Sequence, residues 1–353
     1  MIVTVIVFLL IFSIVVIAHE FGHFLLAKKN GINVVEFAVG MGPEIAKIER
    51  NGTKYILRLL PIGGACMFEG EDGLQTDANQ GVAPEGSFQS ATVWARISTV
   101  IAGPLFNILL AFFLSLFIVG FGGSDRPVVT DIMEGYPAQT AGIQAGDTIL
   151  RMDGNRVHLY REVSLNSMIN RGEPIDITYE RAGKEYETTI QPAFDKESGR
   201  YYIGLRGSGE YISPKGFSIF QYGFYEVRFS LVSTFKSLGM LLHGKITKDD
   251  VAGPVGIAIV IDDAIEQTSP YGTSAVVLTM LNIAILLSVN LGVLNILPVP
   301  ALDGGRLVFL LIEAVRGKPI SPEKEGMVHF IGFAALMILM VFVLFNDLSR
   351  LFR

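Results

Sequence analysis

Four long apolar segments constrain this chain more than any other feature of its sequence. They cover residues 1–27, 97–121, 274–297 and 327–345, and a helix needs about 20 apolar residues to cross a bilayer. Half of the 353 residues are hydrophobic and the mean hydropathy is +0.46, which is more apolar than is usual for a soluble domain. The sequence therefore predicts a polytopic α-helical membrane protein with four transmembrane helices.

The first apolar segment is expected to be a retained span rather than a signal peptide. It has no basic residue ahead of the apolar run and no small-residue cleavage site. The net charge of −6 gives no indication of nucleic-acid binding. Cys66 is the only cysteine, which excludes an intrachain disulfide.

A polar motif, His19-Glu20-Phe21-Gly22-His23, interrupts the first apolar segment. On a helix the two histidines are four residues apart and share a face, so both imidazoles can bind one zinc ion. In the H-E-x-x-H pattern the glutamate, here Glu20, is the general base that takes a proton from water. Polar groups inside a membrane helix are costly, and they therefore indicate a functional site.

The distribution of lysine and arginine predicts the orientation of the spans. Basic residues follow the first span at once, precede the second, and separate the third from the fourth, at Lys28, Lys29, Lys47, Arg50, Lys54, Arg58, Arg96, Arg306, Arg316, Lys318 and Lys324. The positive-inside rule places these loops in the cytoplasm and the N-terminus outside. Residues 123–270 are then extracytoplasmic, and the histidines lie within the membrane, nearer its cytoplasmic side.

Residues 34–43 and 55–64 have β-branched residues, alternation and Gly/Pro punctuation, which predict a small membrane-associated β-sheet. It is either an ordinary juxtamembrane hairpin or an edge strand that captures an extended substrate. Residues 70–90 are expected to form a solvated loop. Asn107 lies in the second span. It either forms a hydrogen bond to a neighbouring helix or contributes to the site of the histidine motif, and the helix–helix hydrogen bond is favoured.

An α+β domain is predicted between the second and third spans. Residues 137–154 combine a short helix, a Gly-Asp turn, a strand and an Asp-Gly turn, and they resemble the core pattern of a bacterial PDZ domain. A generic small β-domain is the alternative. Residues 217–242 are expected to form one or two amphipathic helices on the outer membrane surface. A fifth span there would reverse the topology downstream. Residues 252–257 are expected to form a turn.

The third span ends in a second informative stretch, residues 295–305, with the pattern N-x-x-P-x-P-x-x-D-G. Pro298 and Pro300 predict a kinked or unwound backbone. Asp303 follows at the same membrane level as the histidines, and it is the expected third zinc ligand, with a helix N-cap as the alternative. Asn295 either stabilises an oxyanion or holds the substrate chain; the alternative is that it only holds helices together. His158, His243 and His329 are weaker metal candidates.

Together, the two motifs and the inserted domain resemble the site-2 protease family of intramembrane zinc metalloproteases, in particular its bacterial regulator of sigma-E protease type. The resemblance implies one catalytic Zn²⁺ held by His19, His23 and Asp303, with Glu20 as the general base. It also implies that Asn295, Pro298 and Pro300 shape the substrate path. Gly40-Met41-Gly42 resembles a Gly-aromatic-Gly substrate-binding turn of the family, with Met41 in place of the aromatic residue.

What the resemblance implies for function is hydrolysis of peptide bonds within or near the transmembrane segments of single-span proteins. The implied substrates are pre-cleaved anti-sigma factors and remnant signal peptides, in regulated intramembrane proteolysis and stress response. The implied location is the bacterial cytoplasmic membrane, and a peptide C-terminus is a possible ligand of the PDZ-like domain. A non-catalytic membrane adaptor and a zinc protease whose site lies in a soluble domain are the alternatives.

The expected order along the chain is as follows: a first span with H-E-x-x-H (1–29), a cytoplasmic or re-entrant β-region (30–95), a second span (96–122), the PDZ-like domain (123–195), an extracytoplasmic connector with amphipathic helices (196–270), a third span with the second motif (271–305), a cytoplasmic loop (306–326), and a fourth span with the tail (327–353).

Overall fold

The computed structural model describes residues 2–70, 84–196, 200–206, 209–244 and 252–351. Most of the loop predicted for residues 70–90 lies outside these ranges. The chain divides into two compact units, residues 1–111 with 234–353 and residues 112–233. The helices α2 (Val93–Gly122) and α5 (Ser218–Leu242) each continue from one unit into the other.

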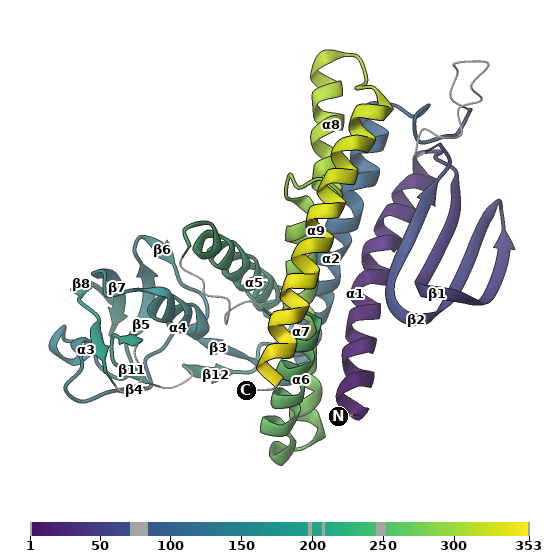
Figure 1. Ribbon diagram of the computed structural model, residues 1–353. Helices are drawn as coiled ribbons and strands as arrows, with labels where there is room; N and C mark the ends of the chain where they lie inside the picture. The colour runs from purple at the N-terminus through teal and green to yellow at the C-terminus, as the bar shows by residue number, and fades with distance from the viewer. Residues whose placement is uncertain (1, 71–83, 197–199, 207–208, 245–251, 352–353) are drawn as a thin grey trace. The chain divides into compact units, whose positions relative to one another are not determined.

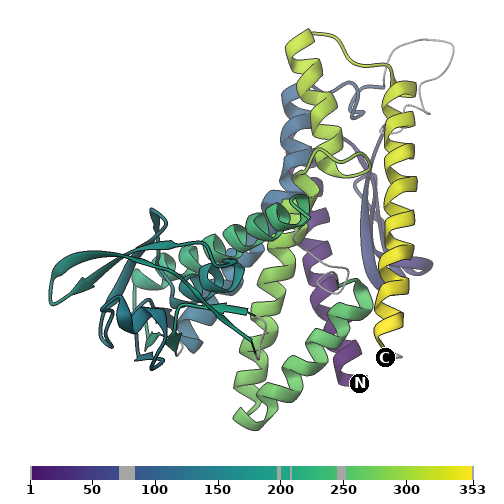
Figure 2. The ribbon, with the colours of Figure 1, turned by 60° about the vertical axis from the view of Figure 1, so that its left-hand side comes forward.

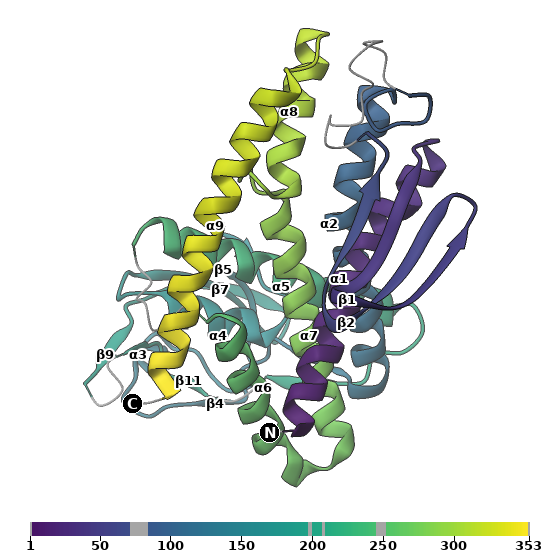
Figure 3. The same cartoon turned by 45° about the vertical axis from the view of Figure 1, so that its right-hand side comes forward.

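The first unit is built on long apolar helices. In the part of the chain that the structure describes, four helices are long and apolar enough to cross a membrane: α1 (Ile2–Lys29), α2, α7 (Thr273–Ile296) and α9 (Pro322–Leu351). They match the four apolar segments of the sequence. Figures 1 and 3 show α1, α7 and α9 with roughly parallel axes; the chain runs through α9 in the opposite direction to α1 and α7. Much of their surface is exposed and apolar, as expected for helices whose surroundings are lipid.

The described residues of this unit also include the last part of α5 and the shorter elements α6 (Pro254–Thr268), η2 (Ser269–Tyr271, a 3₁₀ turn) and α8 (Asp303–Arg316). Residues 254–257 begin α6, so the turn predicted for residues 252–257 is wrong there. Proline fits the first turn of a helix because the N–H that it lacks would be unpaired at that position. The buried carboxylate of Asp347, on α9, accepts the N–H groups of Gly253 and Gly256 at 3.1 and 2.8 Å, and this contact joins α9 to α6 (Figure 2).

The predicted sheet beside α1 consists of two long strands, β1 (Val34–Arg50) and β2 (Thr53–Phe68), which pair with several register shifts. Residues 36–39 have partners on both sides, residues 54–57 and residues 64–67. Both strands therefore fold back, and Gly40 and Gly42, each with φ +89°, permit the reversal in β1. Phe24 of α1 contacts Phe37 and Tyr55, so the sheet packs against α1 (Figure 3).

The second unit contains the inserted α+β fold and the first part of α5. Its core is a four-stranded antiparallel sheet of order β6-β5-β7-β8, with α3 and α4. Buried aliphatic side chains such as Ile149, Ile177 and Ile190 form the hydrophobic core. The element bounds are β3 Ser124–Arg126, β4 Asp131–Ile132, α3 Pro137–Thr140, β5 Thr148–Met152, β6 Asn155–Arg156, α4 Tyr160–Ile169, β7 Ile175–Arg181, β8 Lys184–Ile190, β9 Ala193–Asp195, β10 Arg200–Tyr202, β11 Leu205–Arg206 and β12 Glu210–Ile212.

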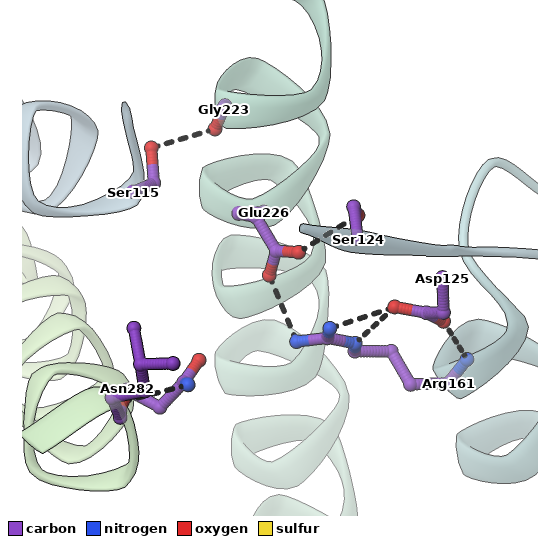
Figure 4. A network of polar contacts seen from close by, with 8 residues as sticks. Ser115, Ser124, Asp125, Arg161, Gly223, Glu226 and Asn282 are labelled. Atoms are coloured by element: carbon purple, nitrogen blue, oxygen red, sulfur yellow. Dashed lines mark hydrogen bonds and ion pairs between the residues drawn. The ribbon is translucent and has the colours of Figure 1, made fainter. Parts of the chain in front are cut away.

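A buried charge network fixes α4 to α5 and β3 within this unit (Figure 4). Arg161 of α4 donates to Asp125 on β3 at 2.7 Å and to Glu226 on α5 at 2.8 Å. Burial raises the pKa of the Glu226 carboxyl, and the Arg161 guanidinium opposes that rise. Ser124 also donates to Glu226, at 3.3 Å. Two buried carboxylates thus depend on one guanidinium, which makes the position of α4 against α5 specific.

α5 is one continuous helix of 25 residues. This agrees with the helical prediction for residues 217–242. Its aromatic residues Phe217, Phe220 and Phe224 are exposed, and polar side chains such as Glu226 lie on the packed side. The membrane-surface location of this segment stays a prediction.

Candidate metal centre

The two histidines of the first motif and Asp303 come together in the first unit. His19 and His23 are buried on one face of α1, and Asp303 is the first residue of α8. The distance between the two Nε2 atoms is 3.2 Å. Asp303 Oδ2 lies 3.0 Å from His19 Nε2 and 3.2 Å from His23 Nε2. Within the described residues this is the one group of three or more His, Cys, Asp or Glu side chains whose ligand atoms converge so closely.

This arrangement fits a zinc ion. A tetrahedral zinc with ligand bonds of about 2.0–2.2 Å holds neighbouring ligand atoms about 3.3 Å apart, and the three atoms here form a nearly equilateral triangle of 3.0–3.2 Å sides. Asp303 Oδ2 is buried and has no hydrogen-bond partner. A buried carboxylate oxygen without a donor is costly, and a cation bound by all three atoms would remove that cost. Two nitrogens and one oxygen also leave a fourth position open.

One face of α2 supports the two imidazoles from behind. His23 Nδ1 donates to the backbone carbonyl of Thr99 at 2.9 Å. Because a carbonyl can only accept, the His23 proton is on Nδ1 and the lone pair of Nε2 points to the metal position. Asn107, fully buried, places its amide Nδ2 3.2 Å from His19 Nδ1, and its Oδ1 has no partner, so a turn of the amide group would present the oxygen to His19 Nδ1 instead. With Nε2 committed to a metal, His19 carries its proton on Nδ1 and needs the amide oxygen of Asn107 as acceptor.

Gly103 lies between these two contacts, at four-residue spacing from Thr99 and Asn107. A Cβ atom at this position would lie 2.2 Å from His23 Nε2 and 2.9 Å from His19 Cε1. The glycine therefore leaves the space in which the imidazoles, and a metal between them, fit against α2. Thr99 and Gly103 were not among the predicted site residues, and Asn107 was favoured as a helix contact. The sequence signal for all three is their four-residue spacing, which places Thr99, Gly103 and Asn107 on one face of the second span.

Glu20 lies between the two histidines in sequence and is partly exposed. Its carboxylate accepts a backbone hydrogen bond from Cys66 on β2 and interacts electrostatically with His19, His23 and Asp303. A Cβ on Gly64 would lie 3.0 Å from Glu20 Cγ, so β2 passes close to this side chain. A carboxylate in this position can accept a proton from a water molecule at the open side of the metal position.

The backbone between α7 and α8 is non-helical over residues 297–302. This confirms the expected interruption at Pro298 and Pro300. Asp303 is not an N-cap, because Leu302 occupies that position and no side chain caps the helix. The Asp303 carboxylate points to the histidines instead. Gly304 and Gly305 allow the close return of the chain, since Cβ atoms there would lie 2.1 Å from Leu297 O and 2.5 Å from Val299 O.

The predicted substrate-binding residues lie at two places. Gly40, Met41 and Gly42 form the reversal in β1, where Met41 is 56% exposed and its side chain approaches Gly63 on β2. Asn295 is half-buried in the last turn of α7, Pro298 is exposed, and Pro300 is half-buried against α9. Their role in binding substrate stays a prediction.

The three other histidines are separate from this cluster. His158 stacks on Tyr225 with ring centroids 4.1 Å apart, and burial, with the nearby Arg228 and Arg156 cations, lowers the pKa of its imidazole. His243 contacts the Gly239 carbonyl at the end of α5. His329, on α9, contacts the backbone of Ala301 and does not converge on the metal position.

Comparison with known proteins gives matches over nearly the whole chain. A profile of peptidase family M50 matches residues 7–339. A putative zinc metalloprotease of Clostridium acetobutylicum is 36% identical over 344 residues, which is 97% of this chain and 96% of that protein. The zinc metalloprotease RasP of Shouchella clausii is 34% identical, and the regulator of sigma-W protease RasP of Bacillus subtilis is 31% identical. Each of these two alignments covers 99% of both chains. A solved PDZ domain from Listeria monocytogenes matches 23% of this chain and 85% of its own, at 28% identity and a TM-score of 0.21.

Proposed function

The chain belongs to peptidase family M50, the site-2 protease family, and is a zinc metalloprotease with helices long and apolar enough to span a membrane. From that premise we propose that it cleaves peptide bonds within or next to the transmembrane segments of single-span membrane proteins. One observation carries the proposal. The three converging ligand atoms belong to an apolar helix and to the helix that follows another apolar helix. A soluble substrate has no access to a site at that depth, whereas a membrane segment does.

The residues of the site divide the chemistry between them. His19, His23 and Asp303 would hold the zinc ion, and His23 and His19 are oriented by Thr99 and Asn107. When bound, zinc supplies a Lewis acid that polarises a peptide carbonyl and increases the acidity of water. Glu20 takes the proton from the attacking water and returns it to the leaving amine. Asn295 would contact the substrate chain near the reacting carbonyl.

The substrate would be bound in an extended conformation. A peptide bond in a helix is shielded by its own turn and must be unwound before water reaches it. β2 passes beside Glu20, at Gly64 and Cys66, and main-chain pairing with a strand at this place would hold a substrate segment extended. The reversal at Gly40, Met41 and Gly42 would limit how far along the sheet that segment lies.

The substrates would be single-span proteins already shortened by another protease, such as anti-sigma factors, together with remnant signal peptides. The B. subtilis relative is named a regulator of sigma-W protease, which supports a role in regulated intramembrane proteolysis during stress. The basic loops support a cytoplasmic location for the metal-proximal ends of the helices and an extracytoplasmic location for the second unit.

The function is tested with the purified full-length protein and a panel of single-span substrates in detergent. We expect cleavage of single-span helices at sites mapped inside or next to the apolar segment, and loss of cleavage when a chelator removes zinc. An unfolded soluble protein should be a poor substrate. Efficient cleavage of the soluble protein, with the membrane helices left intact, would instead favour a zinc protease of another kind.

A groove in the second unit supports peptide binding by the PDZ-like fold. It has a volume of about 260 Å³ and lies between α4 and the segment that leads into β11. β11 pairs with β4 through Leu205 and Arg206, and an extended peptide beside this segment would be held by its main chain. The lining residues are Tyr160, Val163, Ser164, Ser167, Met168, Tyr201, Tyr202, Ile203, Gly204 and Leu205.

A membrane-impermeant fluorescent peptide tests both the groove and its location. Spheroplasts that express the full chain should bind an apolar peptide with a free C-terminus, and the variant Met168→Glu should weaken binding about tenfold or more. Lys184→Ala, at the exposed β7–β8 turn, is the matched control. Binding that occurs only after lysis would place the groove in the cytoplasm, and equal binding by wild type and Met168→Glu would mean that the groove is not the peptide site.

A further inference from the structure

The third ligand reaches the metal position from an irregular segment, residues 297–302, rather than from a regular element. Two residues before Asp303, Ala301 has φ +73°. This left-handed conformation is unfavourable for a residue with a Cβ atom, so surrounding contacts must hold it. The position of the Asp303 carboxylate therefore depends on whatever fixes Ala301.

A histidine on α9 makes that contact. The backbone N–H of Ala301 donates to His329 Nδ1 at 2.9 Å. Because an N–H can only donate, Nδ1 must carry the lone pair and the imidazole must be the neutral tautomer with its proton on Nε2. His329 Nε2 has no hydrogen-bond partner and lies 3.9 Å from Glu325 Oε1. The ring also packs beside Phe309 of α8, with centroids 5.6 Å apart.

Gly332 brings α9 close enough for this bond. It lies three residues after His329, on the same side of the helix. A Cβ atom at Gly332 would lie 2.3 Å from Pro300 Cβ and 2.7 Å from Pro300 O. The helix thus presents a gap for Pro300 and, one turn earlier, an acceptor for Ala301. Little of the apolar part of α9 is buried, and apart from the Asp347 contact with α6 near its C-terminal end, these two contacts are what fixes α9 beside the segment before Asp303.

We propose that His329 is a positioning residue of the zinc site: its Nδ1 accepts the N–H of Ala301 and, with Pro300 seated against Gly332, fixes the segment that carries Asp303 to the metal. The inference rests on the proposed zinc site of His19, His23 and Asp303. It gives the fourth apolar helix a role in the reaction although that helix contributes no ligand. His329 acts on Asp303 through the backbone, without touching the metal.

Isosteric variants of His329 separate this hydrogen bond from simple packing. In His329→Asn the amide oxygen takes the place of Nδ1 and can still accept from Ala301, whereas in His329→Gln the amide lies nearer the place of Nε2. His329→Leu removes all polar function. Each full-length variant is purified, and its zinc affinity, kcat and KM for a single-span substrate, and unfolding midpoint are measured beside wild type.

We expect His329→Asn to stay within about threefold of wild type. His329→Gln and His329→Leu should lose about 10- to 100-fold in zinc affinity, the range for contacts that orient a ligand, with kcat lowered more than KM. Equal activity and zinc affinity of all three variants and wild type would overturn the proposal. Equal impairment of all three at unchanged unfolding midpoint would also overturn it, because packing of the ring would then be the cause.

Two glycines of α9 give an independent test. Gly332→Ala should displace Pro300 and reduce zinc affinity and kcat, whereas Gly326→Ala has open space around its new methyl group and should change neither. A Gly332→Ala protein as active as Gly326→Ala would contradict the proposal. If the wild-type protein binds no stoichiometric zinc or cleaves no single-span substrate, that result contradicts the proposed function, and the proposed role of His329 is then contradicted as well.

Discussion

The variant Glu20→Gln should lose proteolysis almost completely while it keeps its fold and its zinc. The amide has the size of the carboxylate but cannot accept a proton from water at neutral pH, and a positioned general base contributes about 10²- to 10⁴-fold to the rate. His19, His23 and Asp303 are untouched by the change, so zinc content should stay near one per chain. Cleavage of a single-span substrate, zinc content and the unfolding midpoint are measured on purified wild type and variant.

The matched control for this variant is Glu49→Gln on the exposed half of β1. It makes the same chemical change on a segment that pairs with residues 53–58, whereas Gly64 and Cys66 pair with the other part of β1, at Val39 and Phe37, so it should be as active as wild type. Full activity of Glu20→Gln would eliminate Glu20 as the base. Loss of both zinc and activity in Glu20→Gln would mean that the carboxylate binds the metal instead. The converging ligand atoms belong to His19, His23 and Asp303, and Glu20 is not among them.

The variant Gly103→Ala should lose zinc and activity together. A methyl group at this position would lie 2.2 Å from His23 Nε2 and 2.6 Å from His23 Cε1, far closer than the contact distance of about 3.5–4.0 Å between non-bonded heavy atoms. The backbone of α2 cannot retreat freely, because the Thr99 carbonyl is bonded to His23 and the Asn107 carbonyl accepts from Ser288 of α7 at 2.8 Å. The imidazoles must therefore move away from the metal position. We expect zinc affinity to fall by about 100-fold, the upper end of the range for changes that disturb the orientation of metal ligands.

Gly120→Ala is the control on the same helix, because its new Cβ would have one neighbouring atom, at 4.0 Å. It should match wild type in zinc affinity and cleavage, since that distance is ordinary contact. Zinc affinity measured by competition with a chelating dye decides the comparison. A Gly103→Ala protein with wild-type zinc affinity would show that the two histidines do not occupy the space against α2 when metal is bound.

Much of the fold follows from local patterns. Runs of apolar residues are long enough to predict α1, α2, α7 and α9, because a bilayer requires every backbone group to be paired within a helix. Alternation and glycine punctuation predicted β1 and β2. The start of α6 was predicted as a turn, since Gly253 and Pro254 are typical of both a turn and a helix start. The contact that selects the helix is made by Asp347, about ninety residues further along the chain.

The candidate ligands were also found from the sequence, because the spacing of His19 and His23 fixes their common face on any helix. The roles of Asn107, Thr99 and Gly103 were not, since a buried amide, a backbone carbonyl and a glycine are all common in packed membrane helices. Only the contact distances between α2 and the two imidazoles show that these three residues belong to the metal centre. The same holds for His329, for which the sequence favoured a helix-contact or interfacial role over a metal ligand but did not indicate the backbone N–H that it accepts.

By itself, the sequence determined which segments are helical and apolar, where the polar motif interrupts them, and which side chains have the chemistry to bind zinc. These properties depend on neighbours within one or two turns. The tertiary structure alone decided that Asp303 Oδ2 lies within 3.0–3.2 Å of both Nε2 atoms, that α2 leaves space for them, and that α9 holds the segment before Asp303. Such distances are set by packing between helices far apart in the chain, and no local pattern encodes them.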